Sequence, residues 1–569
     1  MNILKKRFCL FALMVTLAFV ANAQVVINVE APSQGADATH LLQEAIDKAA
    51  RNGGKPTVIR LATAQYNISR AEATARLFHV SNTTTVQENP APTKHIGLHF
   101  KGLKNVTFDG NGAKLLTHGE MTSFLIDDCE NVKLCNFTLD ADDPSLAEAT
   151  VVEVGEGYAV LRTARDTRYE ITPEGKLFWT GHGWRFTGGI AQVFNPADNS
   201  SLRAASPMDG LLKTAELRPG LLWMQYAKKP NMKVGTTYQM RHSYRTEVCG
   251  CVHRSKNVTL QNIDFNFLGN FGIVGQFSEN LTYDNIRCAP AYGSDRTGAG
   301  FADFVQMSGC KGLVKVANSY FEGAHDDPIN VHGTHLKVTE WRGNRQAVVR
   351  FMHGQTFGFD PFVKGDDVEI ISAHSLLALQ SLKVAASEQL NDYEWLLTFN
   401  RDVNADAKAE DNVAVENVTW TPSVEIRNNY FARIPTRGIL VSTRRPVVIE
   451  DNVFFRMPMA SILISDDARS WYESGPVRDV TIRHNKFVEC SSPVLLLWPE
   501  NDRFDGAVHH NIRVLNNTFS FMDSEHPLVV KARAVEGLRV EGNRFETQAP
   551  AASLFDLRDC ENVQIDCAE

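Results

Sequence analysis

A short unit of alternating apolar and polar residues recurs along most of the chain. The shared unit is a three-residue strand that alternates apolar and polar residues, followed by an Asn and then by an aromatic or aliphatic residue. Copies begin at residues 104, 130, 256, 279, 478, 511, 538 and 561. Alternation with a period of two is the pattern of a β-strand that buries one face. We therefore expect one short strand in each copy.

The Asn near the end of the unit predicts a tight bend, because Asn tolerates a left-handed backbone and can bond neighbouring backbone groups. An apolar residue follows the bend, and it is most often aromatic. We expect it to point back into the core, and the residues concerned are Phe137, Phe265, Phe321, Phe431, Phe454, Phe487, Phe519 and Phe545.

The spacing of the copies indicates a solenoid. Asn262 and Asn285 are 23 residues apart, Asn429 and Asn452 are also 23 apart, and other steps run to about thirty. Short strands at such a period are typical of a coil that stacks on itself, so we predict an all-β parallel β-helix. A propeller or a sandwich is the alternative, but a propeller blade needs about forty residues and antiparallel strands.

Two stretches, residues 150–245 and 335–420, lack the repeat but keep strand-like alternation between Gly and Pro turns. We expect each to be a small antiparallel, barrel-like β module inserted into a loop of the helix. Before the repeats, apolar residues between 39 and 50 recur at helical spacing, which suits a cap over the open end of a solenoid. The expected divisions are 1–23, 24–149, 150–245, 246–334, 335–420 and 421–569.

Residues 1–23 carry a basic start, an apolar run too short to span a bilayer and an Ala-Asn-Ala cleavage site, so they predict a secretory signal. We expect the mature chain to be periplasmic or extracellular, with no membrane span. The net charge of −8 and the lack of a basic stripe argue against a nucleic-acid partner. The sequence leaves the oligomeric state open, a homodimer included. Of the cysteines, Cys249 and Cys251 could form a redox pair or half a metal site, and the others read as core fillers.

The chemistry is expected at three aspartates. Asp303 and Asp326 are 23 residues apart, one pitch of the predicted coil, so they should stack on adjacent coils roughly 4.8 Å apart. Asp327 would lie beside Asp326. Crowded carboxylates raise the pKa of at least one member, which gives a protonated acid next to ionised bases. Glycoside hydrolysis needs that combination.

The neighbouring side chains suit a sugar. His325, Asn330 and His332 could bond sugar hydroxyls or hold the carboxylates. A calcium site is the competing interpretation, because clustered carboxylates also suit hard cations. Two further acidic pairs, Asp142-Asp143 and Asp466-Asp467, are interpreted as solvated turn residues.

The coil pattern, the cap and the arrangement of Asp303 with Asp326-Asp327 resemble the pectin-lyase-like right-handed β-helix hydrolases. The run from His325 to His332 and the two inserts are similar to glycoside hydrolase family 110 across essentially the whole mature chain. The resemblance implies an inverting exo-α-1,3-galactosidase without metal or cofactor, acting on terminal α-galactosyl glycans of blood group B or linear type. It implies Asp326 as general acid and Asp303 and Asp327 as the base pair, and Arg444 is added as a substrate-binding residue.

Two other functions stay open on the residues alone. One is a calcium-dependent pectate-type lyase, although the Gly-His-Gly and Arg-x-Lys motifs of galacturonate enzymes are incomplete in this chain. The other is a glycan-binding solenoid without catalysis. The stereochemistry is also open, because carboxyl groups about 5 Å apart suit a retaining enzyme, whereas about 6.5–9.5 Å suits an inverting one.

Overall fold

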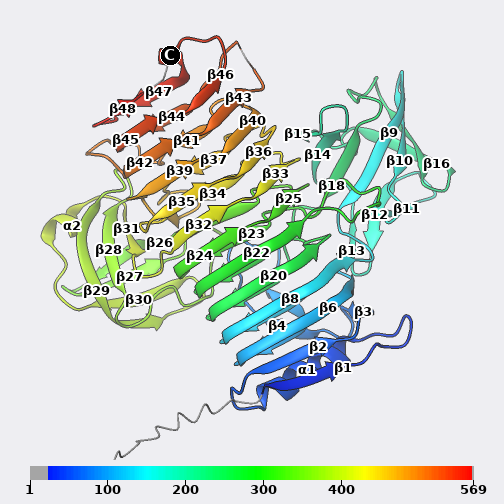
Figure 1. Cartoon of the computed structure of the whole chain (residues 1–569), viewed down its shortest axis with the longest axis horizontal. Coiled ribbons are helices and arrows are strands. Elements are labelled where there is room, and N and C mark those ends of the chain that lie inside the picture. The colour runs from blue at the N-terminus through cyan, green and yellow to red at the C-terminus, as the bar shows by residue number, and fades with distance from the viewer. Residues whose placement is uncertain (1–23, 524, 567–569) are drawn as a thin grey trace, which may run out of the picture.

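The computed structural model describes residues 24–523 and 525–566, so the predicted leader lies outside the described residues. The chain starts with a cap. Strand β1 (Val25–Val29) is followed by helix α1 (Thr39–Ala50), then by β2 (Thr57–Leu61) and β3 (Gln65–Ser69). The helix buries Leu42, Ala45, Ile46 and Ala49, and Figure 1 shows it at the blue end of the stack. The helix lies where the periodicity of residues 39–50 predicts it.

The body is a right-handed parallel β-helix whose coils have three faces. In one coil, β20 (Lys256–Phe265) supplies the first two faces and β21 (Ile273–Gln276) supplies the third. Asn262, at φ 55°, bends β20 between its two faces. The next coil begins with β22 (Glu279–Cys288), which pairs with β20 in parallel register. Apolar side chains from all three faces form one continuous core.

The third face carries the site described below. Its strands pair in parallel from one coil to the next, in the order β5 (Thr93–Lys101), β7 (Thr122–Asp127), β19 (Gly250–His253), β21, β23 (Val305–Ser308), β26 (Ile329–Arg342), β34 (Ile439–Val441), β37 (Ile462–Ile464), β41 (Leu495–Leu497), β44 (Val530–Arg533) and β47 (Phe555–Arg558).

Asparagine ladders and stacked phenylalanines hold the later coils in register. In a buried ladder each amide Nδ2 donates to the Oδ1 of the next coil at 2.9–3.0 Å, along Asn429, Asn452, Asn485, Asn517 and Asn543. The predicted phenylalanines stack behind them from Phe321 to Phe545. In these coils the left-handed residue is the one before the ladder Asn, for example His484. The bend and the ladder are thus divided between two adjacent positions.

Both interruptions are antiparallel β modules. Module I runs from β9 (Ala147–Gly155) to β18 (Thr237–Arg241). Its seven-stranded sheet has the order β15 (Ser200–Ala204), β14 (Ile190–Asn195), β18, β9, β10 (Tyr158–Thr163), β17 (Leu221–Tyr226) and β16 (Leu211–Arg218), and its three-stranded sheet consists of β11 (Arg168–Ile171), β12 (Leu177–Gly181) and β13 (Trp184–Phe186). Module II is a closed six-stranded barrel in the order β26, β27 (Gln346–Arg350), β30 (Glu394–Phe399), β29 (Ala378–Gln389), β28 (Asp367–Ser372) and β31 (Val413–Asn417). Strand β26 is shared, because its first residues pair with β23 and its later ones with the barrel.

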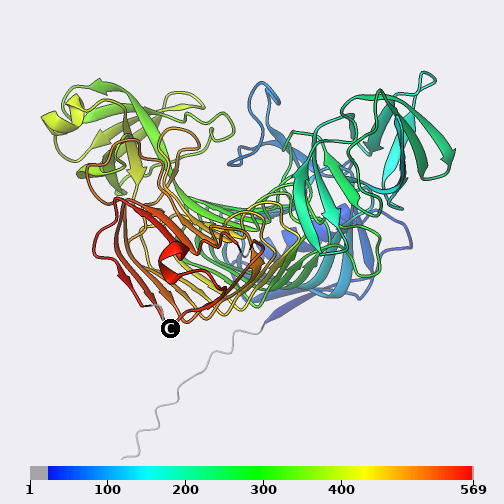
Figure 2. The same cartoon turned by 90° about the horizontal axis from the view of Figure 1, so that it is seen from above.

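The two modules stand on the same side of the β-helix, one at each flank (Figure 2). Each has its own apolar core. A segment between β4 (Thr74–Leu77) and β5 rises between them (Figure 2). No helix among the described residues is long and apolar enough to cross a membrane.

Candidate active site

The three aspartates lie where two neighbouring strands of the third face begin. Asp303 precedes β23, and Asp326-Asp327 precede β26. Val305 pairs with Ile329, an offset of 24 residues. Asp327, rather than the expected Asp326, is therefore in step with Asp303. The backbone N–H of Phe304 donates to the Asp327 carbonyl at 3.4 Å, which ties the two turns together.

All three aspartates line one cavity of about 420 Å³. Its walls come from far-apart parts of the sequence, because successive coils place their turns side by side. Asn330 lies within β26, and the remaining wall residues are Asn82, Arg245, Arg437, Leu440, Ser442, Leu463, Ser465, Asp467, Ser470, Trp471, Glu473 and Glu500. The cavity is thus rich in acidic and hydroxyl groups, with two arginines.

Asp327 is held by Arg437 from the next coil. The guanidinium Nε lies 3.0 Å from both carboxylate oxygens, and Nη2 lies 2.8 Å from Oδ2. The backbone N–H of Arg437 also donates to Oδ1 at 3.2 Å. Burial raises the pKa of Asp327, and Arg437 opposes that rise. A forked guanidinium of this kind fixes both the orientation and the charge of a carboxylate.

Asp326 faces three arginines from three parts of the chain. Its Oδ2 lies 3.4 Å from Nη2 of Arg245 and 3.7 Å from Nη2 of Arg203, and its Oδ1 lies 3.9 Å from Nη2 of Arg437. Arg203 belongs to β15 (Ser200–Ala204), so module I reaches the site. These longer contacts leave Asp326 the most exposed of the three carboxylates.

Asp303 is the most strongly perturbed acid of the site. Burial, followed by the negative charges of Asp326 and Asp327, raises the pKa of Asp303 well above its usual range. Its Oδ2 accepts a hydrogen bond from Asn330 at 3.5 Å. Asp303 is therefore the carboxyl group of the site that most readily holds a proton, and the neighbouring Asp327 is the one paired with Arg437.

Comparisons with known proteins assign the chain to a family. Residues 147–237 match the family model GLAA-B beta-barrel domain I, and residues 346–413 match GLAA-B beta-barrel domain II. Alpha-1,3-galactosidase A of Bacteroides thetaiotaomicron is 45% identical over 538 residues, covering 94% of each chain. The chain belongs to the α-1,3-galactosidase family, glycoside hydrolase family 110. As a member of this family it is a glycoside hydrolase.

Another family member, alpha-1,3-galactosidase A of Bacteroides fragilis strain YCH46, is 38% identical and covers 92% of this chain and 88% of its own. Among solved structures, the Streptococcus pneumoniae surface protein and adhesin PfbA aligns with a TM-score of 0.40 at 12% identity, covering 95% of this chain and 99% of that chain. So distant a likeness carries no argument about function.

Three of the seven predicted site residues do not line the cavity of this family member. His325 is buried, and its Nε2 pairs with Oε1 of Gln239 in module I at 2.9 Å. Burial and nearby arginines lower the pKa of His325 well below its usual value. It braces the turn before β26 as a neutral side chain. His332 is also buried, with Nδ1 2.7 Å from the Gly333 carbonyl.

Arg444 is the clearest correction. It forms a buried ion pair at the base of module II, with its Nη2 2.6 Å from Glu369 and its Nε 2.9 Å from Glu416. A buried arginine needs such partners, because an unpaired charge away from water is costly. Its role is to join the barrel to the β-helix, and the arginines that line the cavity are Arg245 and Arg437.

The interpretation of Asp466-Asp467 as a solvated turn pair is also wrong, because both residues are buried. Asp467 lines the cavity and caps a turn by accepting backbone hydrogen bonds from Arg469 and Ser470 at 2.8 and 2.9 Å. Of the other pair, Asp143 is buried and Asp142 is half-buried. Asp142, Asp143 and His182 form the one cluster of possible metal ligands among residues 24–523 and 525–566.

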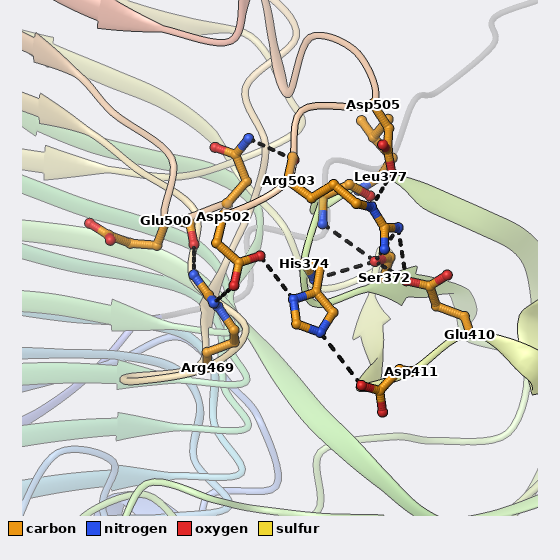
Figure 3. Close-up of polar contacts among 12 residues, drawn as sticks. Ser372, His374, Leu377, Glu410, Asp411, Arg469, Glu500, Asp502, Arg503 and Asp505 are labelled. Carbon is orange, nitrogen blue, oxygen red and sulfur yellow. Dashed lines mark hydrogen bonds and ion pairs between the residues drawn. The ribbon is translucent and has the colours of Figure 1, made fainter.

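The cavity wall is anchored to module II beside Glu500. The carbonyl of Glu500 accepts a hydrogen bond from Nη2 of Arg469 at 2.5 Å. Two residues on, Asp502 contacts Nδ1 of His374 at 2.8 Å, and Arg503 donates to Glu410 at 2.8 Å (Figure 3). The contacts of Asp502 and Arg503 hold the loop after β41 against module II.

Cys249 and Cys251 pack into two different apolar clusters. Cys249 and Cys251 are free and buried, and burial raises the pKa of both thiols. Cys129, Cys135, Cys288, Cys310 and Cys490 are likewise free and buried, as expected for core fillers, whereas Cys560 is partly exposed. Cys567 lies outside the described residues.

Proposed function

We propose that this enzyme releases terminal α-1,3-linked galactose from blood group B glycans, linear α-galactosyl glycans or both. One observation carries the proposal. Asp303, Asp326 and Asp327 share a cavity in a chain that is 45% identical to an alpha-1,3-galactosidase A over nearly its full length. The acidic wall suits a neutral sugar, because carboxylates accept hydrogen bonds from hydroxyl groups and repel a uronate.

For the mechanism we propose inversion, with Asp326 as the general acid, as the resemblance implies. Asp327 then activates water, supported by its forked contact with Arg437. In this assignment the proton lies on Asp326 when the substrate is bound. Asp303 is then ionised and shares the base role with Asp327. The raised pKa of Asp303 favours a competing assignment, in which Asp303 itself donates the proton to the leaving oxygen.

Leaving-group dependence separates these assignments. We would measure kcat for Asp303→Asn, Asp326→Asn and Asp327→Asn on a dinitrophenyl α-galactoside, which needs no protonation to depart, and on an α-1,3-galactosyl disaccharide. The variant that lacks the acid should keep activity on the aryl substrate alone, whereas a variant that lacks the base should lose both activities. Retained aryl activity in Asp303→Asn, but not in Asp326→Asn, would reverse the roles.

The substrate and the absence of a metal are tested with the wild-type enzyme. Galactose release from the disaccharide and from blood group B trisaccharide is compared with and without EDTA. We expect release that EDTA does not change, with β-galactose as the first product anomer seen by NMR. No release from either sugar would refute the proposed substrate, and initial α-galactose would refute inversion.

Export also remains a proposal. The predicted signal at residues 1–23 would place the enzyme in the periplasm or outside the cell, and N-terminal sequencing of secreted material should begin at Gln24. A homodimer is a further prediction, which sedimentation of the purified enzyme would test.

A further inference from the structure

One wall of the cavity is built by a segment that returns from a later coil to the catalytic strand. Strand β38 (Glu473–Ser474) pairs antiparallel with β26, with Thr334 opposite Glu473. The preceding turn is fixed by Asp467, which accepts backbone N–H groups of residues 469, 470 and 471. The side chains of this wall are therefore presented on a rigid backbone, as a recognition site requires.

One of the two carboxylate oxygens of Glu473 makes polar contacts, and the other has none. Its Oε1 accepts a hydrogen bond from Nδ2 of Asn82 at 2.9 Å and lies 3.5 Å from Nε2 of His332. Among the residues that the structure describes, no hydrogen bond occupies Oε2. Glu473 and Asn82 both line the cavity. The negative charge of Glu473 contributes to raising the pKa of Asp303. Glu473 is thus a fixed acceptor close to the reacting carboxylates.

Trp471, two residues earlier, adds an apolar surface. One face of its ring stacks on His353, with centroids 4.1 Å apart, and the residue is 43% exposed and lines the cavity. A galactose ring has its 4-hydroxyl axial, so the opposite face carries mainly C–H groups. A tryptophan face is suited to such an apolar patch, whereas a carboxylate beside it is suited to the hydroxyls.

We infer that Glu473 binds a hydroxyl group of the terminal sugar through Oε2, while Trp471 packs against the C–H face of the same ring. Asn82 would hold Glu473 in place from the segment between β4 and β5. This assignment rests on the proposed function and specifies which wall recognises the non-reducing galactose. It makes Glu473 a specificity residue beyond the three aspartates.

The test is a double-mutant cycle between enzyme and substrate. Wild type and Glu473→Gln are assayed on a nitrophenyl α-galactoside and on its 2-, 3-, 4- and 6-deoxy forms. Aryl substrates confine the effect to the terminal sugar. A hydrogen bond to a charged group is worth about 10- to 100-fold. We expect kcat/KM to fall by about that factor for Glu473→Gln on the parent, and for wild type on one deoxy sugar.

The cycle is decisive because the loss of kcat/KM caused by Glu473→Gln and the loss caused by removing the hydroxyl should not multiply when both changes are combined. If Glu473 binds that hydroxyl, the deoxy sugar costs Glu473→Gln almost nothing further. If each of the four deoxy sugars lowers kcat/KM by the same factor in wild type and in Glu473→Gln, the assignment is overturned. A shifted pH profile without coupling would mean that Glu473 acts only through the charge on Asp303, which also overturns it.

Controls separate folding and substrate failures. Glu489→Gln replaces a half-exposed glutamate that pairs with Arg456, and it should behave as wild type. Unchanged Tm in Glu473→Gln excludes loss of fold. Wild type is assayed on the parent galactoside first, because its inactivity there would refute the proposed function rather than the role of Glu473. Trp471→Leu should raise KM more than Trp471→Phe if the ring packs on the sugar.

Discussion

Replacing Arg437 by Met should disable Asp327 as a base at acidic pH while leaving the cavity in place. Arg437 makes contacts of 2.8–3.0 Å to both oxygens of a carboxylate that is 2% exposed. The backbone N–H of residue 437 remains to donate to Oδ1. Methionine preserves most of the side-chain volume, so charge and the forked hydrogen bonds are the main quantities removed.

The magnitude follows from the pairing. An opposite charge at this range lowers a carboxyl pKa by about 1–3 units, so its loss should raise the pKa of Asp327 by that amount. At about 1.4 kcal/mol per unit, this is roughly 1.4–4 kcal/mol, close to the cost of breaking a buried ion pair. A base works only when ionised. At a pH below the new pKa, kcat/KM should therefore fall by about 10- to 1000-fold and recover as the pH rises.

The assay is kcat/KM against pH on a nitrophenyl α-galactoside for wild type, Arg437→Met and Arg437→Lys. The acidic limb should move upward by about 1–3 units in Arg437→Met, and by less in Arg437→Lys, which keeps the charge but not the fork. Circular dichroism and Tm confirm the fold. An acidic limb that coincides with wild type would refute the view that Arg437 controls the charge of Asp327.

Three further predictions concern the framework of the site. Burial raises the pKa of Glu148 from 4.5 to about 7, so stability present below pH 4.5 should be lost as pH rises through 7, by roughly 3 kcal/mol. Glu148→Gln should remove that slope in urea unfolding at pH 5 and 8, and parallel slopes would contradict it. Asn485→Ala interrupts the buried ladder and should lower the unfolding free energy by about 2–4 kcal/mol, against little change in exposed Asn231→Ala. Arg203→Ala should lower kcat/KM while leaving Tm within a few degrees. The reason is that this arginine of module I contacts only Asp326 among the site carboxylates of the described chain. Unchanged kinetics would mean that module I does not contribute to the reaction and only supports the fold.

The repeat pattern predicts the β-helix because the information is local. Each strand needs only its own alternation, and each bend needs only a residue that tolerates positive φ, as Asn262 and Asn285 do. The aromatic residue after the bend is likewise specified within its own coil. Stacking of identical coils then follows, since the exposed edge of one coil can be satisfied only by the next.

The expected stack of Asp303 on Asp326 was one residue out of register, and the reason is a β-bulge at the start of β24 (Lys311–Ala317). Glu279 pairs with Lys311 but Leu281 pairs with Val314, so this coil holds one more residue than the 23-residue pitch, and Asp327 became the partner. Arg437 was missed for a related reason. Ile329 pairs with Ile439 at an offset of 110 residues, because module II is inserted between the two coils. Subtracting the insert would have recovered the normal pitch.

By itself, the sequence determined the solenoid, the two inserted modules, the capping helix and the aspartates, since each depends on periodicity or on neighbours in the chain. Only the tertiary structure decided which polar side chains line the cavity. Arg437 and Arg444 flank the same strand, β34, yet Arg444 forms an ion pair with Glu416 and Arg437 forms one with Asp327. That outcome depends on which distant carboxylate folding brings within a few ångströms, and no local pattern encodes it.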